Sequence, residues 1–175
     1  MSALTPPVGG HDHVAGPADA PVTLVEYGDF ECPYCGQAYP IVQAIQKRMG
    51  DRLRFVFRNF PLTESHPHAE HAAEAAEAAG AQGRFWEMHD QLYEHQHALS
   101  DHDLIGYAAG LGLDSARVGR ELGQGTFTPK VRSDFRGGVR SGVNGTPTFF
   151  IQGVRYDGPW TNAAGFLRAL QAAAR

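Results

Sequence analysis

The stretch PVTLVEYGDFECPYCGQAYP, residues 21–40, decides the fold of this chain. Its first eight residues are mostly apolar and β-branched and lie between a proline and a glycine, so they predict a buried strand. From Pro33 onward, apolar side chains recur at helical spacing, which predicts a helix kinked at Pro40. RLRFVFRNF, residues 52–60, alternates and predicts a second strand. Strand, helix and strand within about 40 residues predict a right-handed crossover with a parallel strand pair.

The remainder of the chain divides by composition. Residues 1–18 are rich in Pro, Gly and Ala and predict a flexible N-terminal arm. Residues 65–142 lack strand patterns and predict a helical insertion. After it, two short apolar runs flank Gln152-Gly153, a hairpin signal, and an amphipathic helix closes the chain. The predicted fold class is α/β: a core of residues 19–64 and 143–175, interrupted by the inserted helical domain.

Composition and charge exclude several classes of protein. With 175 residues, the chain is long enough for a hydrophobic core of its own. A net charge of −4 argues against nucleic-acid binding, which needs a clustered basic surface. Membrane insertion is not expected, because no apolar run approaches the roughly 18–20 residues that span a bilayer. The first residues lack the pattern of a secretory signal, so the expected location is cytoplasmic. The alternative is a periplasmic or other extracytoplasmic protein whose export signal was removed or lies outside this chain.

The two cysteines, Cys32 and Cys35, are the candidate reactive groups. They lie between the predicted strand and the predicted helix, where unpaired backbone N–H groups and the helix dipole lower the pKa of a thiol. Cys32 is expected to be the exposed nucleophile, and Cys35, one turn further, the resolving thiol. Pro33 and Tyr34 between them are expected to tune the stability of the thiolate. A redox-active Cys32–Cys35 disulfide, with no other cofactor, is the expected chemistry.

A zinc site is the local alternative, but structural zinc usually takes four ligands and the chain has no second cysteine pair. Its histidines do not follow the pair at the spacing that zinc sites use. We therefore expect no bound metal. The histidine groups are interpreted as solvated helix faces or parts of the arm, and they lie at residues 11 and 13, 66, 68 and 71, and 95 and 97.

Glu26 interrupts an otherwise apolar strand six residues before Cys32. If it is buried beneath the cysteines, desolvation raises its pKa, and it can accept and return the proton of Cys35. The alternative is a glutamate on an edge strand, facing solvent. A second unusual feature is Thr146-Pro147, because proline lacks the N–H that a following strand would use. A cis peptide bond is one solution.

Together these features resemble the thioredoxin superfamily, and within it the bacterial DsbA-like thiol:disulfide oxidoreductases. The segments that carry the resemblance are DAPVTLVEYGDFECPYC, GRFWEMHDQLYEHQ, LGLD and GVNGTPTFFIQG. The resemblance implies a thioredoxin-like core with an inserted helical domain, a cis Pro147 against the cysteines, and a Thr146 that binds extended substrate peptides. It also implies the roles of buried acid, nucleophile and resolving thiol for Glu26, Cys32 and Cys35.

The predicted function is disulfide exchange with protein substrates through the Cys-Pro-Tyr-Cys couple, in a direction the sequence leaves open. The family's strongly oxidising members carry Pro-His where this chain has Pro33-Tyr34, so a weaker oxidant is expected. Expected partners are protein thiols and disulfides and an unknown thiol or disulfide redox partner, with the chain a monomer. The alternatives are a glutathione-dependent transferase or isomerase of the same fold, and a non-catalytic metal-binding or chaperone-like module.

Overall fold

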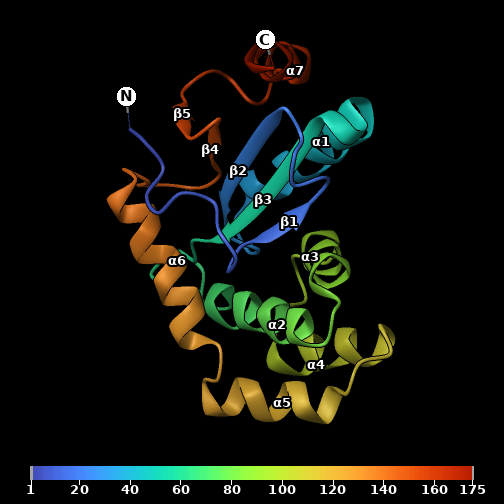
Figure 1. Cartoon of the computed structure of the whole chain (residues 1–175). Coiled ribbons are helices and arrows are strands. Elements are labelled where there is room, and N and C mark those ends of the chain that lie inside the picture. Colours follow the sequence, from blue (N-terminus) through green and yellow to red (C-terminus); the bar gives the residue numbers. More distant parts are fainter. Residues whose placement is uncertain (1, 175) are drawn as a thin grey trace.

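The computed structural model describes residues 2–174 and gives an α/β protein with a five-stranded sheet (Figure 1). A short 3₁₀ turn, Gly50–Arg52, joins α1 to β3. The elements in chain order are β1 (His13–Ala15), β2 (Val22–Gly28), α1 (Pro33–Met49), β3 (Leu53–Asn59), α2 (Ala69–Ala81), α3 (Phe85–Glu94), α4 (Asp101–Gly110), α5 (Ser115–Gln124), α6 (Thr128–Arg140), β4 (Thr148–Ile151), β5 (Val154–Tyr156) and α7 (Ala163–Ala173).

The sheet has the strand order β1-β3-β2-β4-β5. β2 and β3 are parallel, which confirms the predicted crossover through α1, and the other pairs are antiparallel. β2 is therefore a central strand, and every one of its residues is buried. The hairpin between β4 and β5 turns at Gln152 and Gly153, whose φ angles of 51° and 78° are those of the predicted two-residue turn.

The residues of β2 alternate between two hydrophobic cores, as a strand with both faces covered requires. Leu24 belongs to the larger core, which contains apolar side chains of α1, α3 and α7. Val25 and Tyr27 belong to a smaller core on the other face, where Phe135 of α6 packs. Glu26 alternates with Val25 and Tyr27, so its side chain lies on the same face as Leu24, the face that α1 covers.

The five helices α2–α6 follow β3 and precede β4, and most of them gather below the sheet in Figure 1. α2 is buried along most of its length and packs against α3, α4, α5 and α6. Its many alanines allow this, because small side chains let neighbouring helices approach closely. Ser100 caps the start of α4 and forms a capping box with Asp103. The exact domain boundaries stay a prediction.

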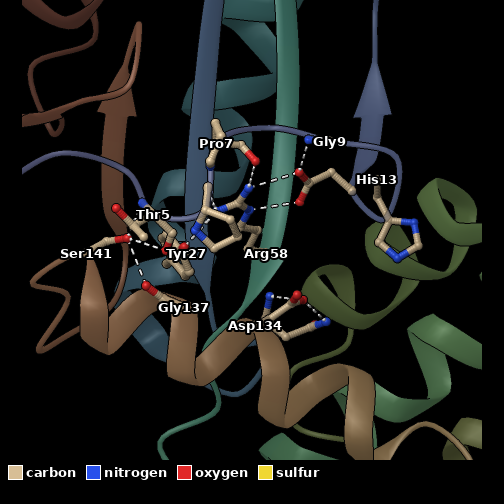
Figure 2. A network of polar contacts seen from close by, with 12 residues as sticks. Thr5, Pro7, Gly9, His13, Tyr27, Arg58, Asp134, Gly137 and Ser141 are labelled. Atoms are coloured by element: carbon tan, nitrogen blue, oxygen red, sulfur yellow. Dashed lines mark hydrogen bonds and ion pairs between the residues drawn. The ribbon is translucent and has the colours of Figure 1, made fainter.

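The N-terminal arm contains structure that its composition does not predict. Residues 13–15 form the edge strand β1, which pairs with β3. Beside it, the buried Arg58 of β3 donates to both carboxylate oxygens of Asp12, at 2.8 and 3.0 Å, and to the Tyr27 hydroxyl (Figure 2). The remaining guanidinium N–H groups donate to the carbonyls of Pro6 and Pro7. The hydrogen bonds of Arg58 thus hold the N-terminal arm against β3.

No helix among residues 2–174 is long and apolar enough to cross a membrane.

Candidate active site

The two cysteines lie at the N-terminus of α1. Cys32 is the N-cap residue, Pro33 takes the first helical position, and Cys35 lies in the first turn. Pro33 is well placed there because its missing N–H would have had no partner within the helix. Both thiols are free and buried, Cys32 with 3% and Cys35 with 0% of its surface exposed. Tyr34 instead is 62% exposed, so the dipeptide between the cysteines faces solvent.

Cys32 is less accessible than the sequence predicts. The expectation of an exposed nucleophile rests on its place in the loop before the helix. In the structure its Sγ lies 3.6 Å from the backbone carbonyl oxygen of Thr146, so the loop before β4 lies against the sulfur. A substrate sulfur must therefore reach the Cys32 sulfur between this loop and the N-terminus of α1.

The two thiols differ strongly in acidity. The pKa of Cys32 is lowered to about 5, chiefly because the Cys35 thiol donates a hydrogen bond to the Cys32 sulfur. Burial opposes this, while the Thr146 side chain and the backbone N–H groups of Cys35 and Tyr34 add to it. The pKa of Cys35 is raised well above its ordinary value by burial first and then by its hydrogen bond to Cys32. At neutral pH the pair is thus one thiolate, Cys32, beside one thiol, Cys35.

Thr146 and Pro147 complete the surface around Cys32. The peptide bond between them is cis. The Thr146 hydroxyl oxygen is buried and has no hydrogen-bond partner among the described residues. It therefore remains free to donate to a thiolate at Cys32, in agreement with its lowering of that pKa.

Glu26 lies in the central strand with 2% of its surface exposed, which excludes the alternative of a solvent-facing edge residue. Its neighbours across the sheet are Phe57 of β3 and Phe149 of β4. No hydrogen bond of the described residues reaches its Oε1. Burial raises the pKa of Glu26 to about 8, and the negative charge of Cys32 contributes further. A carboxyl group with this pKa exchanges its proton near neutral pH.

Two further residues support the loop before α1. The buried Asp29 accepts hydrogen bonds from the backbone N–H of Glu31 and of Leu62, and its Oδ2 lies 2.8 Å from Nδ1 of His66. The side chain of Gln96, beyond α3, donates to the backbone carbonyls of Phe30 and Cys32, both at 2.9 Å. A sequence signal marks Asp29, because this residue directly follows a buried strand. No local signal marks Gln96.

The histidines mostly pair with carboxylates. His13, His66, His68 and His71 each lie within 2.6–2.8 Å of an Asp or Glu oxygen. Among residues 2–174, no three His, Cys, Asp or Glu side chains are grouped so that they could hold a metal ion.

Comparisons with known proteins identify the family of the chain. Residues 9–172 match the model of a protein family described as Thioredoxin. A protein named Na(+)/H(+) antiporter NhaA 1 from Salinispora arenicola is 49% identical over 149 residues, 85% of this chain and 23% of that protein. The chain spans only about a quarter of the length of the curated relatives it matches.

Three solved structures share the fold over nearly the whole chain. BdbD from Bacillus subtilis has a TM-score of 0.84 at 24% identity and covers 94% of this chain and 93% of its own. A thioredoxin-like oxidoreductase from Silicibacter pomeroyi has a TM-score of 0.76 at 26% identity, covering 92% and 94%. The protein alpha-DsbA1 from Wolbachia pipientis has a TM-score of 0.79 at 18% identity, covering 98% and 96%.

Proposed function

The chain belongs to the Thioredoxin family, and on that premise we propose that it is a thiol–disulfide oxidoreductase acting on proteins through Cys32 and Cys35. The resemblance to DsbA-type proteins expected from the sequence is confirmed at the level of the fold. The observation that carries the proposal is the placement of two free thiols in one helical turn at the N-terminus of α1, with the Thr146 carbonyl 3.6 Å from the Cys32 sulfur. The lowered pKa of Cys32 and the raised pKa of Cys35 agree with this placement.

This difference divides the chemistry into two steps. The Cys32 thiolate attacks a substrate disulfide, so that one protein–substrate S–S bond forms, the substrate S–S bond breaks and one substrate thiolate leaves. Cys35 then gives up its proton and attacks the Cys32 sulfur. The mixed disulfide breaks, the second substrate thiolate leaves, and the Cys32–Cys35 disulfide forms. The substrate is reduced and the protein oxidised, and the reverse sequence oxidises a substrate.

Glu26 is the proposed acceptor of the Cys35 proton. It is buried on the sheet face that α1 covers, and its charge contributes to the raised pKa of Cys35. A base close to a thiol with a high pKa is needed, because only the thiolate attacks a disulfide. In the reverse direction the protonated Glu26 returns the proton to the departing Cys35 sulfur.

Thr146 and Pro147 are the proposed substrate contacts. The carbonyl of Thr146 lies 3.6 Å from the Cys32 sulfur, so a peptide whose cysteine reacts there must lie along this segment. Backbone groups of Thr146 would then hydrogen-bond an extended substrate. Pairing of this kind depends little on the substrate's side chains, which suits an enzyme acting on many proteins.

The oxidising strength that we propose rests on how strongly the Cys32 thiolate is stabilised. A pKa of about 5 lies between those of thioredoxin, about 7, and of the strong oxidant DsbA, about 3.5. We therefore propose an oxidant of intermediate strength, weaker than the members with Pro-His between the cysteines. Equilibration of the Cys32–Cys35 couple in glutathione buffers measures this, since about 30 mV corresponds to a tenfold change in the equilibrium constant.

The direct test is the reduction of insulin disulfides by dithiothreitol. Wild-type protein should accelerate the precipitation of insulin, and Cys32→Ser should not. Absence of acceleration by wild type would overturn the proposal. Stoichiometric metal in the purified protein, lost in Cys32→Ser, would favour the metal-binding alternative. The proposal needs no cofactor besides the Cys32–Cys35 disulfide. The curated relatives named as antiporters are matched over only about a quarter of their length, so the proposed function rests on Cys32 and Cys35 and takes nothing from their name.

A further inference from the structure

A small cavity lies between the sheet and the helices α1 and α3. Its volume is about 130 Å³. The lining includes the buried Glu26 and also the exposed Gln43 and the partly exposed Asp90, whose side chain is 45% exposed. The cavity therefore reaches from the buried carboxyl group of Glu26 to exposed side chains of α1 and α3. The residues that line it are Ala15, Glu26, Tyr39, Val42, Gln43, Gln46, Phe55, Trp86, His89, Asp90 and Tyr93.

Three buried polar atoms of this lining have no hydrogen-bond partner among the described residues. They are Oε1 of Glu26, Nε2 of His89 and the hydroxyl oxygen of Tyr93. A buried polar atom left without a partner costs about 1–3 kcal/mol, so such atoms are normally satisfied. One water molecule needs a cavity volume of about 10–15 Å³, so a cavity of about 130 Å³ has room for several water molecules. Water in the cavity can satisfy all three atoms.

The hydrogen bond of His89 to Asp90 determines which ring nitrogen faces the cavity as an acceptor. Nδ1 of His89 lies 2.9 Å from Oδ1 of Asp90. A carboxylate only accepts, so Nδ1 carries the hydrogen and Nε2 presents a lone pair. Burial lowers the pKa of His89, which keeps the ring neutral. Phe30, Phe57 and Trp86 meet the ring edge-on at centroid distances of 5.0–5.7 Å and fix its orientation.

We propose that this cavity is a water-filled proton passage between Glu26 and the surface, in which His89 is the relay. The inference rests on the proposed function, because disulfide exchange requires a route by which protons reach and leave Glu26. With a pKa of about 8, Glu26 is mostly protonated at neutral pH. It can accept the Cys35 proton only after its own proton has left, and its buried position leaves the cavity as the route.

The proton steps balance in both directions. When the dithiol is oxidised, Glu26 releases a proton to cavity water, Nε2 of His89 accepts one, and Nδ1 passes its own to Asp90 and so to solvent. Glu26 is then a carboxylate and takes the proton of Cys35. When the disulfide is reduced, a proton returns along the same atoms in the opposite order. The protein alternates between these two states during turnover, so each half-reaction restores the His89 tautomer that the other has changed.

The other titratable groups near His89 do not compete for this role. Tyr93, on the same helix, has a pKa raised well above its ordinary value by burial, so it keeps its hydroxyl hydrogen and can only orient water. Tyr39 of α1 has a raised pKa for the same leading reason. His13 of β1 contributes to the lowered pKa of His89, but its Nε2 is bound to Glu77 at 2.8 Å.

The test separates the two thiol steps with Ellman's reagent. Attack of Cys32 on the reagent releases one nitrothiobenzoate ion, and attack of Cys35 on the mixed disulfide releases the second. Stopped-flow absorbance at neutral pH therefore gives two phases. In His89→Gln we expect an unchanged rate of the first phase and a second phase that is about tenfold slower or more. Proton transfer by a positioned side chain contributes at least about a hundredfold to a rate, and loss of the relay removes part of this contribution. The matched control is His95→Gln, an exposed histidine just after the same helix and outside the cavity lining.

Further measurements separate a relay from a structural role. A relay changes rates alone, so His89→Gln should keep the reduction potential of wild type. In His89→Ala, added imidazole should restore the second phase, whereas it should not affect wild type. A second phase of wild-type rate in both variants would overturn the inference. If wild type itself shows no second phase and no insulin reduction, the proposed function fails instead.

Discussion

Glu26→Gln should change how the stability of the protein depends on pH, in an amount that follows from the burial of Glu26. The pKa of Glu26 is about 8 in the folded chain, against an ordinary value of 4.5. Between these values the folded chain binds a proton that the unfolded chain has lost. The stability due to this group is fully present below pH 4.5 and is lost as the pH rises toward 8.

The magnitude follows from linkage. One proton corresponds to about 1.4 kcal/mol of unfolding free energy per pH unit. At pH 7, about 2.5 units above the ordinary pKa, the loss reaches about 3 kcal/mol. Glutamine has nearly the same shape and cannot ionise. The variant should therefore lose about 3 kcal/mol less than wild type between pH 4.5 and pH 7, whatever the cost of accommodating the amide itself.

The assay is urea unfolding of the reduced protein at several pH values between 4.5 and 8. Glu64→Gln is the matched control, because Glu64 is exposed and its replacement should leave the slope unchanged. In the oxidised protein the difference between wild type and Glu26→Gln should shrink, since the Cys32 charge that contributes to the raised pKa is absent. Equal slopes for wild type and Glu26→Gln in the reduced state would refute the burial argument.

Two further perturbations test the site and its support. Cys35→Ala removes the hydrogen bond that lowers the Cys32 pKa most, so thiolate absorbance near 240 nm should titrate above about 5, and an unchanged midpoint would contradict the assignment. Asp12→Ala leaves the buried Arg58 without its carboxylate partner and should reduce the unfolding free energy by about 3–5 kcal/mol in urea. Asp19→Ala, at an exposed position just after the arm, should change it by less than about 0.5 kcal/mol.

The parts of the fold that the sequence predicts are those with strong local patterns. β2 is a run of apolar and β-branched residues, β3 alternates between apolar and polar residues, and α1 has a helical period, so each can be predicted without its partners. β1 is different, because it has only three residues and no apolar alternation. It is held by contacts far apart in the chain, such as Arg58 with Asp12 and His13 with Glu77. A sequence pattern within a short window carries no information about such pairs.

The same distinction holds within the site. Cys32, Cys35 and Glu26 are recognisable because they lie together on one strand–helix unit. The near-complete burial of Cys32 was not predicted, because it depends on a loop more than 100 residues away, at Thr146. His89 lies among the buried apolar side chains of α3, and no sequence pattern sets it apart from them. Its role at the cavity depends on the position of α3 against α1, which no local pattern specifies.

The low pKa of Cys32 depends on the helical insertion as well as on the core that contains the cysteine. The leading groups that lower the pKa are neutral hydrogen-bond donors: the Cys35 thiol, the Thr146 side chain and two backbone N–H groups of α1. Such donors act over a short range, so their effect requires a fixed loop before the helix. Gln96, from the insertion, holds that loop through the carbonyls of Phe30 and Cys32. The insertion thus stabilises the thiolate by positioning neutral donors around it, whereas a histidine at position 34 would have stabilised it by charge.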